Sequence, residues 1–410
     1  MDGSLLRLED SQDVTDQGVA LDHLRLGWRP IVGRDRRVLG VRIEVSVTPG
    51  TSEASSAATL GAVIAALADQ TTSPSRGLVV LAPTPLSLSS DLQTIAQWKS
   101  KASVMLEVGG DALTARQLPM IEAAHQNGNK FVLRSSSQPL PRDSHRLFAA
   151  VIDAPTNAKR EGVPALWVRD VHTRSDVESA LTHGAQATIG WPLDEPMVEP
   201  SAGLEPTRRA VLDIVRLIQA DADVIALERA FKNEPSLALM LLSVINSPAF
   251  APSSAQSAPI TSLRHAILVL GYKRLVRWLV LLLGVSSAST RSMPLVYMAV
   301  QRGFFLEALA SQVGGVRDDL FAVGAFSLLQ QITGHSHERL FASAALPRPV
   351  LDAVRAHQGV YGVYLALAEV IERGDAIGSQ RAGQLVGVSM GQINAALLAS
   401  LAAADAITMN

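Results

Sequence analysis

The stretch NEPSLALMLLSVINSPAFAPSSAQSAPITSLRHAILVLGYKRLVRWLVLLLG, residues 233–284, is the most informative part of the 410-residue chain. It contains two runs of apolar residues at the spacing of a buried helix face. The first run is Leu237, Met240, Leu241, Val244 and Ile245, and the second is Leu263, Ala266, Ile267 and Leu270. Asn246–Pro248 ends the first helix, Thr261 or Ser262 can cap the second, and Gly271 is placed to end it. The stretch therefore predicts consecutive amphipathic helices.

The order of these segments resembles the HDOD domain of bacterial signalling proteins. A helix leads into NSPAF, a loop rich in Ser, Ala and Pro follows, and a TSLRHAILVLG helix comes next. The similarity continues through YMAVQRGFFLEALASQ, LFAVGAFSLLQQITG and HQGVYGVYLALAEVIERGD, with Gln330 where the family commonly has Asp. It covers Leu204–Asp375. That family is similar to HD phosphohydrolases without their metal-binding His and Asp residues, so the resemblance implies regulation by contact.

The first half of the chain alternates short apolar runs with helical segments. The expected strands are Trp28–Val32, Val38–Val47, Gly77–Ala82, Ser103–Val108, Lys130–Leu133, Ala149–Ile152 and Ala165–Val168. The expected helices are Ala57–Ala68, Leu92–Lys99, Gln117–Asn127 and Asp176–His183. Alternation of this kind predicts βα units around a parallel sheet, either a barrel or an open sheet.

The opening GWRPIVGRDRRVLGVRIEVSV, residues 27–47, resembles the entry of the EAL domain. EAL domains are (β/α)-barrel phosphodiesterases that cleave cyclic di-GMP with metal ions held by carboxylates. Together the two resemblances imply an α/β plus all-α protein, in which a shortened, modified (β/α) barrel of EAL type precedes an all-helical HDOD domain. The expected organisation is a flexible tail over 1–23, the EAL-like domain over 24–193, a linker over 194–204 and the HDOD domain over 205–410.

Most positions that carry chemistry in EAL domains have changed in this chain. The resemblance places the family's metal-binding and catalytic positions on Arg42, Ala82, Glu107, Gly110, Arg134, Ser135, Val151, Asp153, Val168 and Ile189. Only Glu107 and Asp153 keep a carboxylate, and Glu44 is a candidate displaced ligand. Divalent-metal hydrolysis needs several oxygen ligands at one point, and arginines there oppose a cation. We therefore expect no metal, no cofactor and no catalysis, with Glu107 and Asp153 as remnants.

Two alternatives stay open at the barrel. Arg42 and Arg134 could bind a phosphate, since arginine suits that role, or they could be structural. The rival to a non-catalytic regulator is a cyclic di-GMP receptor or a residual cyclic di-GMP phosphodiesterase.

Charge is distributed unevenly along the second half. The chain has a net charge of −2, which argues against a nucleic-acid binder, yet Pro235–Leu306 contains no Asp or Glu. The candidate partner-binding residues in that stretch are Arg264, Lys273, Arg274 and Arg277. They form either a solvated basic face or a docking surface for an acidic partner.

Composition also limits the class of protein. The absence of cysteine excludes disulfides and thiolate metal sites. No signal peptide is apparent, and the apolar run Trp278–Val285 is far shorter than the ~20 residues that a membrane helix needs. We expect a cytoplasmic bacterial signal-transduction protein that acts through protein–protein interaction with unidentified signalling proteins. We expect no nucleic acid and no membrane as partners.

Overall fold

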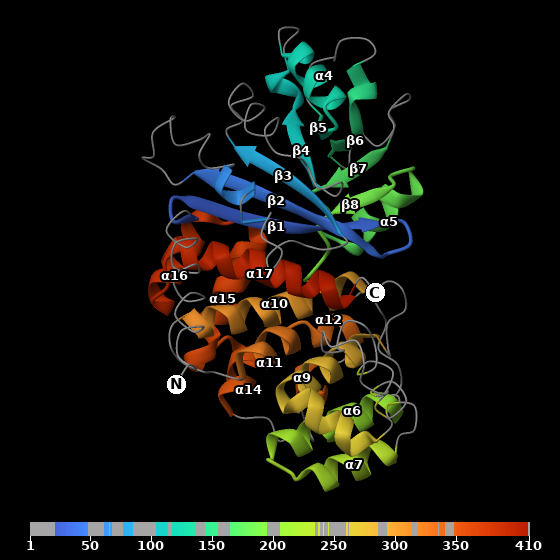
Figure 1. The fold of residues 1–410 in the computed structure, drawn as a ribbon, viewed down its shortest axis with the longest axis vertical. Coiled ribbons are helices and arrows are strands. Elements are labelled where there is room, and N and C mark those ends of the chain that lie inside the picture. Colours follow the sequence, from blue (N-terminus) through green and yellow to red (C-terminus); the bar gives the residue numbers. More distant parts are fainter. Residues whose placement is uncertain are drawn as a thin grey trace, which may run out of the picture. The chain divides into compact units, whose positions relative to one another are not determined.

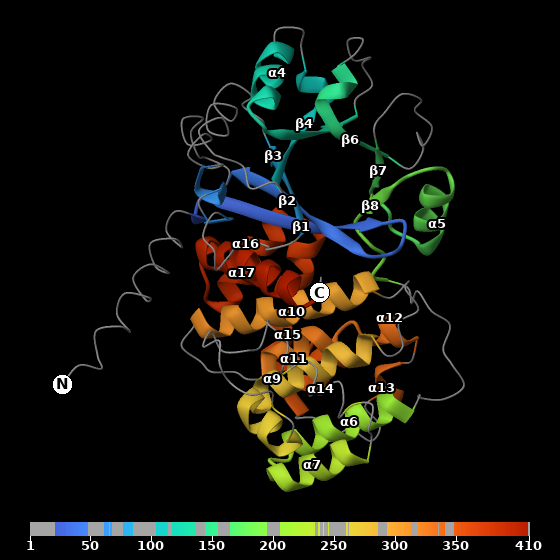
Figure 2. The same cartoon turned by 45° about the vertical axis from the view of Figure 1, so that its right-hand side comes forward.

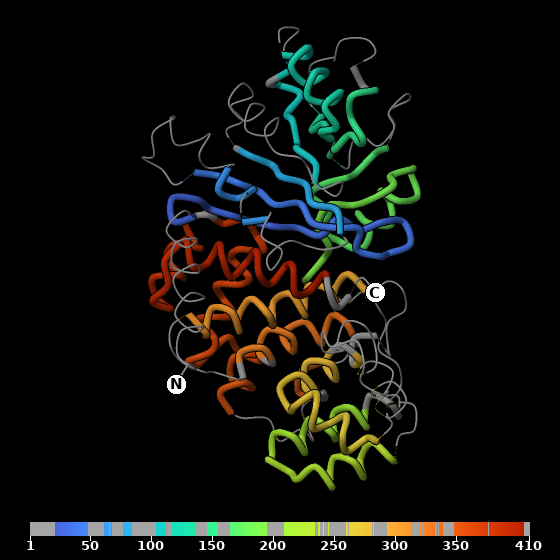
Figure 3. Tube along the Cα trace, viewed as in Figure 1, coloured from blue at the N-terminus to red at the C-terminus, as the bar shows by residue number. Residues whose placement is uncertain are grey.

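The chain forms two compact units (Figures 1 and 3), which are described separately. The computed structural model describes residues 21–47, 61–64, 66–67, 77–84, 104–113, 117–135, 144–154, 165–194, 206–233, 237, 241, 245, 260, 262–285, 293–312, 319–334, 336–340 and 348–408. The barrel unit comprises Met1–Glu195, Phe304–Val316 and Ala366–Asn410. The helical unit comprises Pro196–Gly303 and Arg317–Leu365.

The barrel unit is built on a closed barrel of eight strands in sequence order (Figure 2). The strands are β1 Leu24–Gly33, β2 Val38–Val47, β3 Leu78–Thr84, β4 Val104–Gly109, β5 Lys130–Arg134, β6 Phe148–Asp153, β7 Leu166–Arg169 and β8 Ala187–Ile189. Strands β2 to β8 pair in parallel, whereas β1 is antiparallel to both β2 and β8. The predicted barrel is confirmed, with one reversed strand that the sequence did not indicate.

Apolar side chains fill the barrel interior. They come from every second strand position, as strand geometry requires: Ile31, Val80, Val132, Ala150, Ile152, Trp167, Ala187 and Ile189. Gly40 shows how closely two strands approach, because a Cβ there would lie 1.9 Å from the carbonyl oxygen of Leu78. Any side chain at this position would force β2 away from β3.

Short helices connect the parallel strands. Between β4 and β6 lie the 3₁₀ turns η1 Gly110–Ala112 and η2 Ser144–Leu147 and the helix α4 Leu118–Gln126. Between β7 and β8 lies α5 Arg174–Thr182, which begins with a reciprocal capping box between Thr173 and Asp176. The backbone N–H groups of His172 and Thr173 hold the pKa of Asp176 below its usual value.

The C-terminal helices α16 Ala376–Val386 and α17 Met390–Thr408 belong to the barrel unit. Helix α17 packs against β1 (Figure 1) through a buried polar clamp. The Asn394 side chain accepts from the Leu26 N–H at 3.2 Å and donates to the Leu21 and Leu24 carbonyls at 3.0 and 2.9 Å. Asp22 accepts from the Gly391 N–H at 2.7 Å.

The helical unit consists of helices packed against one another. They are α6 Pro206–Gln219, α7 Val224–Lys232, α9 Leu263–Val285, α11 Asp319–Phe326, α12 Leu329–Thr333, α13 His337–Leu340 and α14 Arg348–Ala356. Helices α10 Met293–Gln312 and α15 Gly359–Arg373 begin in this unit and continue into the barrel unit. Helix α9 is broken at Gly271, whose φ of 74° suits glycine, and Ser262 accepts from the His265 N–H at its start. Ser262 and Gly271 thus act as expected at the start and the break of α9, whereas the predicted stop at 246–248 lies outside the described residues.

Several expectations differ from the structure in detail. The seven predicted strands all exist, but the three-residue β8 was missed because it is too short for an alternation pattern. Leu21 is fully buried and Asp22 is bonded, so the described end of the predicted tail is packed. Leu92–Lys99 lies outside the described residues. The two packed units also differ from the predicted domains, because residues 366–410 pack with the barrel rather than with the helices of the predicted 205–410 domain. The predicted domain boundaries themselves stay a prediction.

Within the described part of the chain, no single helix is long and apolar enough to span a membrane. One bent pair, Ile377–Val386 with Met390–Asp405, meets that test of length and composition together.

Replacing Asn394 with Ala should loosen β1. The change leaves one backbone N–H and two carbonyls without their buried partner, so the free energy of unfolding of the barrel unit should fall by about 2–4 kcal/mol. Urea unfolding and hydrogen exchange of the 21–33 segment would measure this. Gln384→Ala, at an exposed position of α16, is the control. Equal losses in the two variants would contradict the clamp.

Candidate functional site

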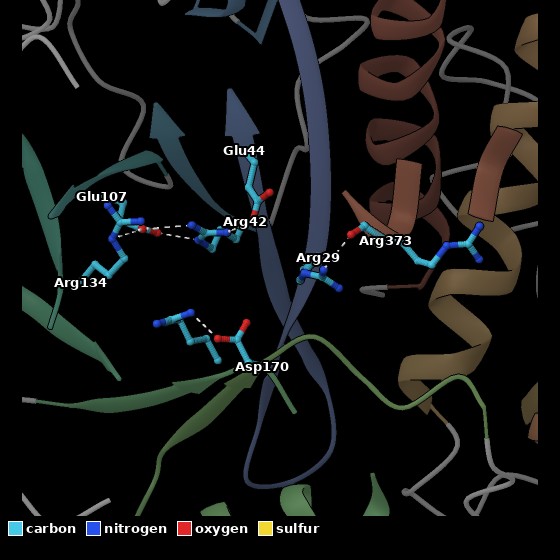
Figure 4. Close-up of polar contacts among 8 residues, drawn as sticks. Arg29, Arg42, Glu44, Glu107, Arg134, Asp170 and Arg373 are labelled. Carbon is cyan, nitrogen blue, oxygen red and sulfur yellow. Dashed lines mark hydrogen bonds and ion pairs between the residues drawn. The ribbon is translucent and has the colours of Figure 1, made fainter. Parts of the chain in front are cut away.

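A buried ion pair joins β2 and β4 inside the barrel (Figure 4). Arg42 Nε lies 2.5 Å from Glu107 Oε2, and Arg42 Nη2 lies 3.0 Å from Glu107 Oε1. The guanidinium thus donates to both oxygens of one carboxylate, which is the strongest geometry for such a pair. Arg42 is 9% exposed and Glu107 is 4% exposed. Arg42 Nη1 also donates to Glu44.

Strand register explains why these two side chains meet. Arg42 pairs with Val80, a residue of the interior cluster, so its side chain takes the interior side of β2. On β4, Met105 packs against the same cluster, and Glu107 lies two residues later on the same side. A shift of one residue on either strand would separate the pair.

The pair keeps the arginine charged. Burial by itself would lower the pKa of Arg42, but hydrogen bonds to Glu107, the charge of that carboxylate and the nearby Glu44 outweigh burial. The pKa is therefore raised above the ordinary arginine value, and the guanidinium stays a cation at any pH at which the protein folds.

Arg134 is the last residue of β5 and stands opposite Gly109. Its Nε lies 3.7 Å from Glu107 Oε1, and its side chain is 43% exposed. A Cβ on Gly109 would lie 3.0 Å from Arg134 Nη2, so the glycine leaves room for this side chain to pass. Arg42 and Arg134 thus both contact Glu107. Arg42 is buried inside the barrel, whereas Arg134 lies at the end of β5.

Other charges near these strand ends are also paired. Arg169 at the end of β7 contacts Asp170, and Arg29 of β1 donates to the Arg373 carbonyl at 3.3 Å (Figure 4).

Because Ile152 belongs to the interior cluster, alternation turns the next residue, Asp153, away from that interior. The two predicted remnants, Glu107 and Asp153, therefore lie on different sides of their strands.

Glu44 and Glu107 are already held by a cation of the chain itself. Both oxygens of Glu107 accept from Arg42, and Glu44 accepts from the same guanidinium. Among the described residues no group of three or more His, Cys, Asp or Glu side chains could hold a metal. A divalent ion bound by these carboxylates would lie next to the fixed positive charge of Arg42. Coulomb repulsion between the two cations opposes this.

The basic residues of α9 divide into two sets. Lys273 and Arg274 are exposed, as are the apolar Leu268 and Val269 on the preceding turns. Arg277 is half-buried, and its guanidinium carbon lies 5.2 Å from the centre of the Phe321 ring. The predicted common face therefore holds Lys273 and Arg274 but not the end of the Arg277 side chain.

Arg264 at the start of α9 already has an acidic partner. Its Nη2 lies 2.7 Å from Glu228 of α7, which also contacts Lys232 at 2.6 Å. The hydrogen bonds from Lys232 and Arg264 lower the pKa of Glu228. This contact ties α9 to α7, so Arg264 has a role inside the helical unit.

Sequence reasoning missed a buried arginine on α10. Arg302 is 3% exposed, and its Nη1 donates to the Ser327 hydroxyl at 2.6 Å. Helices α10 and α11 approach closely there, because a Cβ on Gly324 would lie 2.6 Å from the Arg302 carbonyl oxygen. Gly324 and Ser327, in the GAFS segment, are the sequence signals for this contact. The sequence alone does not show that Arg302 is their partner.

Comparison with known proteins assigns the helical segment. The HDOD domain family matches residues 204–337. This segment is an HDOD domain. The chain thus combines an eight-stranded barrel with a segment that matches the HDOD family.

Two curated relatives cover half of this chain. The cyclic di-GMP phosphodiesterase CdgJ of Vibrio cholerae is 25% identical over 208 residues, which are 50% of this chain and 47% of CdgJ. The uncharacterized protein YuxH of Bacillus subtilis is 23% identical over 208 residues, 49% of this chain and 50% of YuxH. The chain therefore spans about half the length of the curated relatives it matches.

Solved EAL structures show a weak structural likeness. The PaMucR phosphodiesterase in complex with c-di-GMP is 13% identical with a TM-score of 0.33, covering 42% of this chain and 96% of that one. The Bacillus subtilis YkuI protein is 12% identical with a TM-score of 0.33, covering 63% and 74%. Because these scores are low, the barrel assignment rests on the strand order given above.

Replacing Glu107 with Gln should strongly destabilise the barrel unit. The change leaves Arg42 buried without its charged partner, so the free energy of unfolding should fall by about 3–5 kcal/mol. Chemical denaturation would measure the loss. Glu122→Gln is the matched control, because its pair with Arg146 is exposed and should contribute less than about 1 kcal/mol. Similar losses in both variants would contradict a buried pair.

Proposed function

We propose that this chain is a non-catalytic regulatory protein in cyclic di-GMP-linked signalling, and that it acts through protein–protein contacts. The observation that carries this proposal is the Arg42–Glu107 pair. In an EAL phosphodiesterase the barrel carboxylates hold metal ions, as the resemblance implies. Here Glu107 is bound to the cation Arg42 instead. Its oxygens are therefore not available to hold a metal ion that would activate water.

The relationships support the signalling context. CdgJ is named a cyclic di-GMP phosphodiesterase, and residues 204–337 match the HDOD family, whose resemblance implies regulation by contact. The proposal takes from these proteins the signalling system but not the hydrolysis. It assigns the output to surfaces of the HDOD domain.

The exposed part of α9 is the surface we assign to partner binding. Lys273 and Arg274 follow the break at Gly271 and the exposed Leu268 and Val269 precede it, so α9 offers both charge for steering and apolar area for affinity. The chemistry favours an acidic partner segment with apolar side chains. Arg277 contributes to the packing beneath this surface through Phe321.

A cyclic di-GMP receptor is the second candidate function. Arg134 favours it, because its side chain is partly exposed at a strand end and holds Glu107 only at 3.7 Å. Arg42 is a poor phosphate ligand because its fork already faces a carboxylate. Calorimetry with cyclic di-GMP separates the candidates, since a receptor gives heat that Arg134→Gln abolishes, whereas a contact-only regulator gives none.

Purified protein should not hydrolyse cyclic di-GMP with Mg²⁺, Mn²⁺ or Ca²⁺. The reason is that Glu107 and Glu44 are neutralised by Arg42 and cannot converge on a metal ion. Product formation would be followed by chromatography beside an active EAL phosphodiesterase as positive control. Turnover by this chain that disappears in Glu107→Ala would refute the proposal.

Reversing the exposed charges of α9 should weaken partner binding more than folding. The double variant Lys273→Glu with Arg274→Glu should lower affinity for a native partner by roughly 5–30-fold, and less at high salt. Quantitative capture from the native host at two salt concentrations would measure this. Arg348→Glu, at a highly exposed position of α14, is the matched control. Unchanged capture by the double variant would leave α9 as a solvated basic face.

A further inference from the structure

Two arginines of β1 hold the corner between α15 and α16. Arg29 Nη2 donates to the carbonyl of Arg373, the last residue of α15, at 3.3 Å (Figure 4). Arg25 Nη2 donates to the side chain of Gln380 in α16 at 2.9 Å. The two arginines are four residues apart on an extended strand, so they lie on the same side of β1. One side of one strand therefore contacts both helices that meet at the corner.

The corner itself, residues 373–375, is tightly built. Gly374 has a φ of 73°, which suits glycine, and its N–H and that of Asp375 donate back into the last turn of α15 at 3.0 and 3.1 Å. The Asp375 side chain then accepts from the Gly378 N–H at 2.9 Å and so begins α16. Because the end of α15 and the start of α16 share these residues, a shift of the corner moves the end of α15.

Glu44 brings the barrel interior to the same corner. Its Oε1 accepts from Arg42, which also holds Glu107. Its Oε2 lies 3.5 Å from the position that a Cβ on Gly374 would take, and 3.6 Å from the position that a Cβ on Gly27 of β1 would take. The buried pair, β1 and the corner therefore meet at one carboxylate.

The contacts of the corner differ in kind from the clamp on α17. Both arginine contacts are exposed to solvent, and an exposed polar contact is weak because water can replace either partner. Asn394 of α17 is by contrast fully buried together with its three hydrogen bonds. Helix α17 is thus fixed to β1, whereas the α15–α16 corner is held by bonds that can open while the rest of the fold stays intact.

Helix α15 continues from the corner into the helical unit. Its residues 359–365 belong to the helical unit, and its residues 366–373 belong to the barrel unit. The turns of a helix form cooperatively, so the order of one end affects the other. We propose that the α15–α16 corner is a latch. When it is closed on β1 it orders α15 along its whole length, and when it opens both β1 and α15 loosen.

This inference goes beyond the proposed function, because it concerns a conformational coupling within the chain and holds with or without a bound partner. A coupling of this kind is reciprocal. A change that opens the latch from β1 must loosen residues 359–365, and a change that loosens residues 359–365 must loosen β1.

Hydrogen exchange of the full chain tests the first direction. Arg25→Ala with Arg29→Ala removes both bonds from the side of the strand, and should raise the exchange rate of residues 366–386 by roughly 5–30-fold. Residues 359–365 do not contact these arginines in the bonds described, yet they should exchange at least about 3-fold faster, because α15 loosens as one helix.

The matched control is Arg37→Ala with Arg146→Ala, two arginines of the barrel unit whose side chains are 78% and 72% exposed. It removes the same charge and should leave the exchange of α15 unchanged. A response of the Arg25 and Arg29 variant that is confined to residues 373–380, with 359–365 exchanging as in wild type, would overturn the latch and leave an ordinary local contact.

The reverse direction uses Leu365→Ala, at a fully buried position in the helical part of α15. It should raise the exchange rate of residues 24–29 of β1 at least about 3-fold. Leu320→Ala of α11, equally buried in the helical unit, is the matched control and should leave β1 unchanged. Equal responses of β1 to the two variants would also overturn the latch. If Leu365→Ala does not fold, Leu365→Val against Leu320→Val gives the same comparison.

Discussion

The barrel closes through a single reversed strand. β1 is antiparallel to both neighbours, so its hydrogen bonds to β2 on one side and to β8 on the other complete the ring. Only three residues of β8 pair with β1, so the β1–β8 pairing is shorter than the β1–β2 pairing. Long pairing with β2 and the packing of α17 offset the weak seam. The position of Arg29, Arg42 and all interior side chains follows from this closure.

Electrostatics inside the barrel follows from the same register. Closure places Arg42 and Glu107 on interior positions of strands that are not adjacent in the ring, with β3 between them. Val80 of β3 is paired with Arg42 on one side and with Met105 of β4 on the other, so it lies between the two charged positions. Such a pair contributes little net stability relative to apolar residues, yet loss of one partner is costly.

Much of the fold could be predicted from local patterns. Apolar alternation found seven strands, and helical spacing together with Ser262 and Gly271 placed α9. Local patterns did not predict that β1 is antiparallel to its neighbours, because the sequence of a strand does not identify the strands it pairs with. They also missed β8, because three residues are too few to show an alternation. Asn394 was also out of reach, since its partners at Leu21 and Leu26 lie more than 360 residues away in sequence.

The site was predicted as residues but not as contacts. Arg42, Glu107 and Arg134 were all singled out, yet Arg42 was treated as an obstacle to a cation and Glu107 as a remnant ligand. In the structure the two are bonded to each other, because Arg42 donates to both oxygens of Glu107. The contact of Arg277 with Phe321 was out of reach for a related reason, since helical spacing gives the side of α9 but not the ring that lies 5.2 Å from the guanidinium.

Packing and family boundaries give different divisions of the chain, and the difference has a physical cause. The HDOD match ends at residue 337, while α16 and α17 belong with the barrel. A fragment that ends at residue 203 would contain all eight strands but neither Asn394 nor Asp405, whose carboxylate accepts from the Gly77 N–H at the start of β3. The N–H groups and carbonyls that these side chains satisfy would then be exposed at β1 and β3. The stability of β1 and β3 is therefore coupled to side chains of α17, which lie more than 300 residues away in sequence.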